Sequence, residues 1–155
     1  MITIYSSDST GVRGNCLYPY RHKVTDAVGL REAVRHDYVC AEYKGNYRSG
    51  GNFVTSNCLG MDCDNDHTDH EHEWITPDDV RRNFPDVPLA IHFSRHHMKP
   101  KDQKSARPRF HCLFAIEPTT DVKAYADMKA RLNALFPYFD AQALDGARFF
   151  FGTDD

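Results

Sequence analysis

The stretch 57-NCLGMDCD-64 decides how the rest of the chain is interpreted. Its alternation is typical of a strand: Leu59, Met61 and Cys63 share one face, and Asp62 and Asp64 share the other. Two carboxylates at positions i and i+2 point the same way, and bound cations relieve their repulsion. An isolated D-x-D pair is common at exposed strand ends, so a site here requires support from other segments.

The flanking elements are expected in the order strand, helix, strand, strand, helix, strand. The expected strands cover 57–64, 88–94, 108–116 and 147–152; the helices run from the N-cap Thr76 to about Phe84 and from the N-cap Thr120 to Phe136. This order is typical of the α+β ferredoxin-like (RRM-like) βαββαβ sheet, in which the first and third strands are central antiparallel neighbours and the last strand flanks the first. The chain is therefore expected to be one domain, 1–155, with this unit in 57–155.

The sequence of residues 1–56 predicts an N-terminal α/β extension of that sheet. A short amphipathic helix is expected over 25–36, a strand over 38–43, and a glycine-rich loop over 45–52.

The third strand of the expected sheet supplies the support that the acidic pair needs. Phe110, Cys112 and Phe114 fall on its apolar face, whereas Arg109 and His111 fall on its polar face. Since this strand runs antiparallel beside the first, Arg109 and His111 are expected next to the two acids. The helices are expected on the apolar faces, with the polar face left open.

Charge is divided unevenly along the chain. The formal net charge is −3, but 62–73 holds six carboxylates and no Lys or Arg, and 95–109 holds six Lys or Arg against Asp102 alone. This division suits a site that holds divalent cations beside a polyanion. Two solvated loops of opposite sign would give the same pattern.

Composition excludes several classes of protein. No apolar run approaches the roughly 20 residues that span a bilayer, and the first ten residues lack the features of a signal peptide, so no membrane partner is expected. The five cysteines include no C-x-x-C pair, which argues against a disulfide framework and a cysteine-rich structural zinc site. A reducing cytoplasm is the expected compartment.

Three motifs together resemble those of the archaeo-eukaryotic primase (primase-polymerase) superfamily. Leu59–Asp64 resembles the first motif, Arg107–Phe114 the second, which bears one essential His, and Tyr138–Asp140 the third. Versions from phages and mobile elements are also similar to 74–77, 93–99 and the spacing Asp140-x4-Asp145-x2-Arg148. The resemblance covers about residues 52–152. It departs from the family at Arg109, where a small hydroxyl residue is usual.

The resemblance implies a template-dependent nucleotidyltransferase, a DNA primase or primase-polymerase in phage, plasmid or mobile-element replication. It implies two Mg²⁺ or Mn²⁺ ions on Asp62 and Asp64, with Asp140, or alternatively Asp145, as the third ligand. His111 would donate to the incoming triphosphate. The implied cations around that triphosphate are Arg107, Arg109, Lys104, Arg148, Arg95 and Lys99; Arg148 could instead pair with Asp145.

The implied partners are nucleoside triphosphates, a single-stranded DNA template with its primer, and a helicase domain or protein. The implied compartment is the cytoplasm of a bacterial or phage-infected cell.

Two other classes of function stay open. A rolling-circle endonuclease or relaxase would use an H-x-H metal pair, which His70-Glu71-His72 imitates, and a helical tyrosine nucleophile, which Tyr125 imitates. A non-catalytic RRM-like nucleic-acid-binding module would carry aromatic residues on the open strand faces, where this chain carries acids and His111. The histidines His67, His70 and His72 could also bind zinc, although none has a standard ligand spacing.

Overall fold

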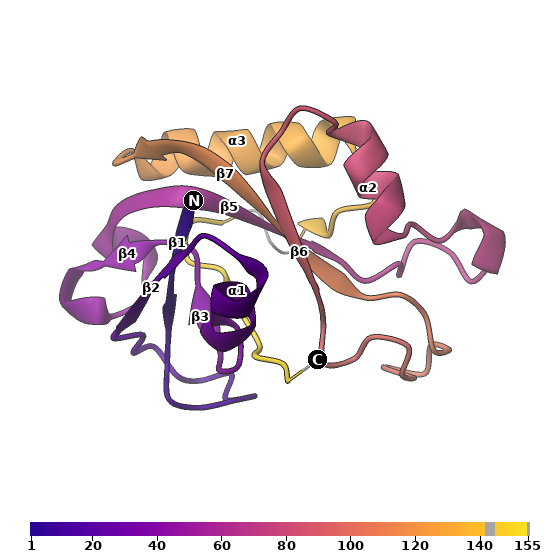
Figure 1. Cartoon of the computed structure of the whole chain (residues 1–155), viewed down its shortest axis with the longest axis horizontal. Helices are drawn as coiled ribbons and strands as arrows, with labels where there is room; N and C mark the ends of the chain where they lie inside the picture. Colours follow the sequence, from indigo (N-terminus) through magenta and orange to yellow (C-terminus); the bar gives the residue numbers. More distant parts are fainter. Residues whose placement is uncertain (142–144, 155) are drawn as a thin grey trace.

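The computed structural model describes residues 1–141 and 145–154. Within them the fold is mixed α+β and contains two four-stranded antiparallel sheets (Figure 1). The first sheet has the order β2-β1-β3-β8 and the second β4-β5-β7-β6. The strands are β1 (Ile2–Ser6), β2 (Tyr20–Val24), β3 (Tyr38–Val39), β4 (Glu42–Tyr43), β5 (Phe53–Cys63), β6 (Leu89–Phe93), β7 (Phe110–Thr119) and β8 (Phe149–Phe150). The helices are α1 (Ala27–Ala33), α2 (Pro77–Asn83) and α3 (Val122–Leu135), with 3₁₀ turns at Lys44–Asn46, Gly50–Asn52 and Glu71–Glu73.

The second sheet is covered on both faces. Leu59, Met61 and Cys63 of β5 are buried in a core with Val80 of α2 and Tyr125 of α3. The opposite face packs against the first sheet and α1, through a core that contains Ile4, Tyr38, Leu113 and Phe150. Figure 1 shows α3 lying along β5 and β7, with β1, β2, β3 and α1 on the other side of these strands. The layers are therefore α2 and α3, then the second sheet, then the first sheet with α1.

The central strands agree with the sequence-based expectation, and the last strand does not. β5 and β7 are antiparallel neighbours in the middle of the second sheet. β8, however, pairs with β3 in the first sheet instead of flanking β5, where β4 lies. Gly60 is the physical reason: a Cβ there would lie 2.7 Å from the Phe150 ring and 2.9 Å from Cys40 Sγ, so the missing side chain lets β8 pack over the face of β5.

The polar face of the second sheet is consequently not open, as the alternation had suggested. Asp62 and His111 are each only 6% exposed, because the first sheet partly covers them. The expected strand over 38–43 is divided between the two sheets as β3 and β4. The chain crosses between the layers at Cys40 and Ala41.

Helix boundaries follow the local capping chemistry. Thr76 caps α2 in a full capping box with Asp79, as expected. α3 is capped by Asp121 rather than Thr120, because Asp121 accepts from the amides of Lys123 and Ala124. α1 is shorter than expected and is capped by Asp26. Among the described residues, no helix combines the length and the apolar character needed to cross a membrane.

Candidate metal centre

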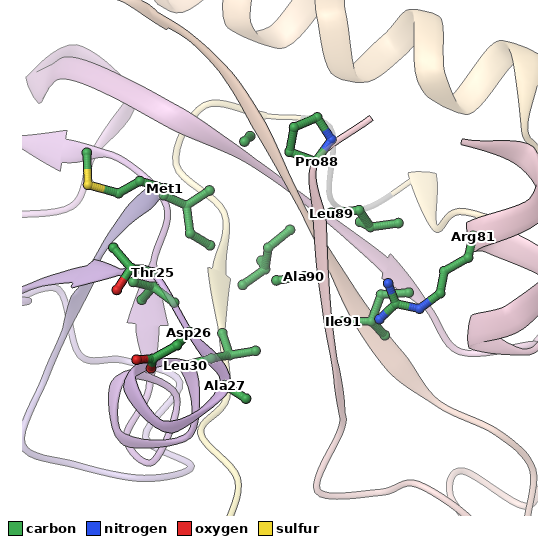
Figure 2. A pocket seen from close by; sticks show the side chains of 14 residues that line it. Met1, Thr25, Asp26, Ala27, Leu30, Arg81, Pro88, Leu89, Ala90 and Ile91 are labelled. Atoms are coloured by element: carbon green, nitrogen blue, oxygen red, sulfur yellow. The ribbon is translucent and has the colours of Figure 1, made fainter. Parts of the chain in front are cut away.

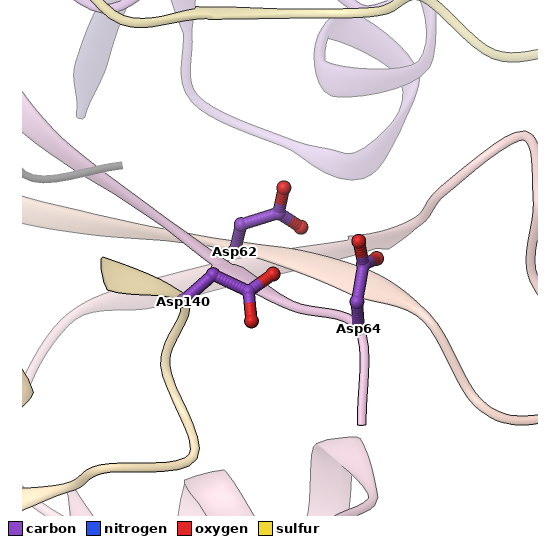
Figure 3. Close-up of side chains that lie close together, drawn as sticks. All are labelled: Asp62, Asp64 and Asp140. Carbon is purple, nitrogen blue, oxygen red and sulfur yellow. The ribbon is translucent and has the colours of Figure 1, made fainter. Parts of the chain in front are cut away.

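Three carboxylates meet where β5 ends. One oxygen from each of Asp62, Asp64 and Asp140 lies within 4.8 Å of the other two (Figure 3). Asp140 reaches the cluster because Phe139 is buried in the core beneath α3 and the Asp140 amide donates to the Asp62 carbonyl at 2.8 Å. The acids therefore come from two segments far apart in sequence, held together by packing and one main-chain hydrogen bond.

The electrostatics of this cluster favour a bound cation. Burial, and then the charge of Asp64, raises the pKa of Asp62 to about 7. Burial, and then the charges of Asp62 and Asp64, raises the pKa of Asp140 to about 8. Asp62 Oδ1 is also buried without a hydrogen bond from any described residue. Crowded carboxylates with an unsatisfied oxygen can hold a metal ion, which removes both their repulsion and the missing bond.

His111 faces Asp62 across the β5–β7 ladder. The two residues are register partners, and His111 Nδ1 lies 3.4 Å from Asp62 Oδ1. Burial lowers the pKa of His111 to about 4, against the charge of Asp64, which raises it. Nδ1 is buried without a hydrogen bond among the described residues, and His111 lines the pocket beside the acids.

This pocket has a volume of about 440 Å³ and two kinds of wall. The three acids of the cluster and His111 form the acidic part of its lining. The rest includes three aromatic residues and four cations: Phe149, Phe150, Phe151, Arg13, Arg95, Lys101 and Arg148. Lys101 Nζ lies 3.1 Å from Asp64, and an Arg148 guanidinium nitrogen lies 3.5 Å from Asp62. A cavity of this size and mixed charge suits a small polyanion that shares cations with the acids.

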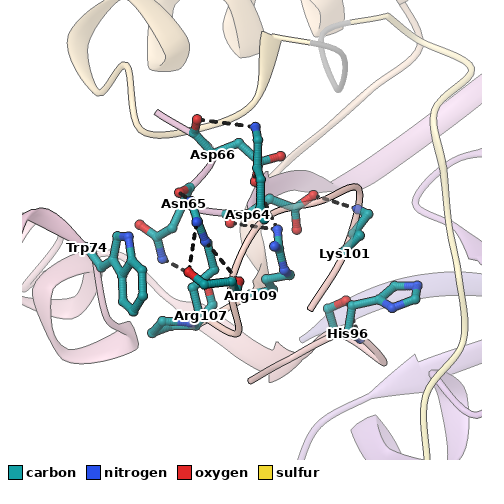
Figure 4. A network of polar contacts seen from close by, with 12 residues as sticks. Asp64, Asn65, Asp66, Trp74, His96, Lys101, Arg107 and Arg109 are labelled. Atoms are coloured by element: carbon teal, nitrogen blue, oxygen red, sulfur yellow. Dashed lines mark hydrogen bonds and ion pairs between the residues drawn. The ribbon is translucent and has the colours of Figure 1, made fainter. Parts of the chain in front are cut away.

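Arg107 and Arg109 lie outside the pocket lining, although the sequence had placed them in the site. Arg107 donates to the carbonyls of Asn65 and Thr68 at 2.9 Å, pairs with Asp69 at 2.9 Å and lies over the Trp74 ring (Figure 4). Arg107 is fully buried, and its contacts brace the loop that follows β5.

Arg109 and Lys104 serve the same loop. Arg109, which is fully buried just before β7, donates to the Asp64 carbonyl and pairs with Asp66, both at 3.0 Å. Lys104 pairs with Asp66 at 3.6 Å. The uneven charge noted in the sequence is thus largely explained by the basic 95–109 segment folding against the acidic 62–73 segment.

The other cations and the alternative acid expected from the sequence lie partly inside and partly outside the pocket. Arg95 lines the pocket with its guanidinium 4.3 Å above the Phe151 ring, whereas Lys99 is exposed and donates to the Arg95 carbonyl. Arg148 pairs with Asp62 and not with Asp145. Asp145 is exposed and accepts from the Ala147 amide at 2.8 Å, so Asp140 is the acid that joins the cluster.

The residues that match the endonuclease and zinc-site patterns lie outside the acidic pocket. His70 and His72 are exposed in the loop around the Glu71–Glu73 turn, and no metal-binding group of three or more residues includes them within the described part of the chain. Tyr125 is buried in α3 and donates to the Cys58 carbonyl at 2.7 Å. Its hydroxyl is not placed to attack a nucleic-acid strand.

Two important residues carried no signal in the sequence. Asp37 is fully buried and accepts 2.8 Å hydrogen bonds from the amides of Gly11, Val12 and Gly152. It thereby joins the loop that bears Arg13 to the C-terminal segment that follows β8. His92, on β6, stacks on His111 with ring centroids 4.9 Å apart. Spacing could not assign either role, because Asp37 binds amides of the β1–β2 loop and of the segment after β8, and His92 bonds to Tyr38 of the other sheet.

A second cavity, of about 340 Å³, opens between α1 and the edge strand β6 (Figure 2). Its lining is mostly aliphatic, with Leu30, Ile91 and Leu113 among its residues, and Asp26 and Arg81 are its charged members. It offers no cluster of acids or histidines, so the metal-ligating chemistry of the described residues lies in the acidic pocket alone.

Comparison of the chain with family models, curated proteins and solved structures found no match. The class of protein that fold and site define is therefore a mixed α+β protein with a buried tricarboxylate cluster in a cationic and aromatic pocket.

Proposed function

We propose that this protein is a template-dependent nucleotidyltransferase of the primase-polymerase type, which uses Mg²⁺ or Mn²⁺. The observation that carries the proposal is the convergence of Asp62, Asp64, Asp140 and His111 in one pocket with four cationic side chains. Ligands that are all oxygen suit Mg²⁺ or Mn²⁺ better than zinc. The β5–α2–β6–β7–α3 portion follows the element order of the ferredoxin-like half that the sequence resembles, although β8 departs from it.

The three carboxylates are proposed to hold two divalent ions. Such ions, when bound, lower the pKa of an attacking primer 3'-hydroxyl and stabilise a leaving pyrophosphate. Asp62, Asp64 and Asp140 would hold these ions, since one oxygen from each lies within 4.8 Å of the other two.

The chain's own residues then bind and orient the nucleotide. His111, which lines the pocket, would donate to a phosphate oxygen. Lys101 and Arg148 neutralise phosphate charge, because the acids that they now pair with bind cations instead. Arg95 and Arg13 complete this wall, replacing Arg107, Arg109 and Lys104 in the role that the sequence had suggested.

The other two functions are less well supported. A rolling-circle endonuclease needs an accessible tyrosine, whereas Tyr125 is buried and hydrogen-bonded. A non-catalytic binding module would not require Asp62 and Asp64 to be buried beside a third, partly buried acid, Asp140, which is costly without a cation. The proposed partners remain nucleoside triphosphates, a primed single-stranded DNA template and a helicase, in the cytoplasm of a bacterial or phage-infected cell.

The deciding experiment is incorporation of labelled nucleotides on primed and unprimed templates with Mn²⁺ or Mg²⁺. We expect incorporation by the wild type and by Asp145→Asn, a matched control in which an exposed acid outside the cluster is changed. We expect at least a hundredfold loss in Asp62→Asn/Asp64→Asn. Equal incorporation by the double variant would exclude the assigned site, and a covalent phosphotyrosine adduct with single-stranded DNA would favour the endonuclease.

A further inference from the structure

Four aromatic rings from both sheets meet beside the metal centre. Tyr38 of β3 stacks on Phe150 of β8, with centroids 5.3 Å apart and an interplanar angle of 22°. His111 of β7 stacks on His92 of β6 at 4.9 Å and 28°, and its other contact is the edge-to-face packing of Phe150 at 4.9 Å and 83°. The His111 ring is thus held between two other rings that belong to different sheets.

The hydrogen bonds of His92 define its tautomer. His92 Nδ1 lies 3.1 Å from the carbonyl oxygen of Phe93, which can only accept, so Nδ1 carries the proton. His92 Nε2 is therefore the acceptor for the Tyr38 hydroxyl, which lies 2.7 Å away. The wholly buried Tyr38 and the nearly buried His92 form a neutral, fully bonded pair.

His111 has no such bond of its own. Its Nδ1 lies beside Asp62 at 3.4 Å, too long and too poorly directed to count as a hydrogen bond among the described residues. The orientation of its ring, which decides whether Nδ1 or Nε2 faces the pocket, therefore depends on the rings packed against it. A 180° flip of this ring would put Cδ2 in the place of Nδ1 and Cε1 in the place of Nε2, so both nitrogens would move without any change to the carboxylates.

We propose that His92, held by the Tyr38 hydroxyl, is a positioning residue that fixes the plane of the His111 ring, so that Tyr38 and Phe150 of the first sheet help to place the His111 nitrogens at the pocket. The catalytic meaning of this arrangement rests on the proposed function. The positioning itself does not, because it concerns only the geometry of four side chains.

Two variants test the two contacts separately. Tyr38→Phe removes the hydroxyl and keeps the ring that stacks on Phe150, and His92→Gln removes the stack on His111. Tyr125→Phe is the matched control, since it deletes a buried hydroxyl with an equally short bond of 2.7 Å at a residue outside the pocket lining. The readout is the pair of His111 imidazole ¹⁵N resonances in long-range ¹H–¹⁵N spectra of the full chain, which report ring tautomer and environment.

We expect the His111 resonances to shift in both test variants and to stay unchanged in Tyr125→Phe. In nucleotide incorporation, we expect kcat/KM to fall about tenfold in Tyr38→Phe, the scale of one lost buried hydrogen bond, with the Kd for Mn²⁺ unchanged because the carboxylates are untouched. His111 resonances identical to wild type in both variants would overturn the positioning role. An equal shift in Tyr125→Phe would also overturn it, by showing a general loss of packing.

The two proposals fail in distinguishable ways. A wild-type protein that incorporates no nucleotide would contradict the proposed function while the ¹⁵N measurement still decides the positioning of His111. If Tyr38→Phe does not fold, His92→Gln carries the test alone, and circular dichroism identifies that case.

Discussion

The backbone amide of Asp140 donates a 2.8 Å hydrogen bond to the backbone carbonyl of Asp62, so the third acid is placed by the main chain and not by its own carboxyl group. Its side chain can therefore be changed while its position is kept. This separation makes Asp140 the best residue for testing metal binding without disturbing the fold.

Asp140→Asn is expected to abolish most of the stabilisation by Mn²⁺ while leaving the metal-free protein at least as stable as wild type. The substitution removes one of three repelling carboxylates and keeps the backbone bond. Thermal melts with and without Mn²⁺ measure both effects. Asp145→Asn is the control, and an undiminished Mn²⁺-induced rise in Tm for Asp140→Asn would contradict the assignment.

Arg107→Lys is expected to lower the free energy of unfolding by about 2–3 kcal/mol, because a lysine cannot make the several bonds of the buried guanidinium. Urea titration measures this change. Since Arg107 braces the loop instead of lining the pocket, the Kd for nucleotide at saturating Mn²⁺ is expected to change far less than in Arg95→Lys. A selective loss of nucleotide affinity with unchanged stability would restore Arg107 to the nucleotide site.

Asp37→Asn is expected to destabilise the protein by roughly 2–3 kcal/mol. An amide offers one oxygen in place of two, so one of the three backbone amides bound by Asp37 loses its acceptor. Urea unfolding provides the measurement, and Asp8→Asn, at an exposed acid, provides the control. A difference under about 0.5 kcal/mol, the scale of an ordinary surface substitution, would show that these bonds contribute little.

Gly60→Ala is expected to cost about 1–3 kcal/mol, because the new methyl group would lie 2.7 Å from the Phe150 ring. Gly50→Ala is the matched control, since nothing lies within 4 Å of a Cβ at that position. Thermal and urea unfolding compare the two variants. Equal stabilities would contradict the close packing of β8 over β5.

The burial of Lys129 is expected to make the stability of the folded protein depend on pH. Burial lowers its pKa from 10.5 to about 8. Between these values the unfolded chain binds more protons than the folded one, so the contribution of Lys129 to stability rises with pH from about 8 to 10.5 and is at its lowest below pH 8.

Lys129→Met is accordingly expected to lack this pH dependence, so that its stability relative to wild type falls by on the order of 3 kcal/mol as the pH rises from 8 to 10.5. Urea titrations of both proteins across this range give the difference. The pH-dependent contributions of the other buried groups are the same in both proteins, so they cancel in the difference. A difference in unfolding free energy between the two proteins that is constant with pH would show that Lys129 does not titrate as its burial implies.

The sequence predicted those parts of the molecule that follow from local pattern. Alternation along 57–64 and 108–116 placed Asp62 opposite His111, and the capping residue Thr76 marked the start of α2. The same alternation could not reveal what covers the polar face. That depends on Gly60, whose role is visible only when Phe150 and Cys40 are seen against it.

The roles of the basic residues could not be predicted from the sequence either. Composition identified a cationic segment, but a cation that binds phosphate and one that braces a loop have the same sequence signal. Arg107 and Arg109 brace the acidic loop, whereas Arg13, some eighty residues away from that segment in sequence, lines the pocket. Contacts between segments far apart in sequence decide the roles of Arg13, His92 and Asp37.

The pairing of the 95–109 segment with the 62–73 segment also affects how the protein responds to ionic strength. Lys104, Arg107 and Arg109 already have carboxylate partners within the chain, so they displace few counterions from a nucleic-acid backbone. Association with the proposed DNA template should therefore weaken only gradually as salt is added. Discrimination among strands would then depend on what fills the pocket more than on long-range attraction to phosphate.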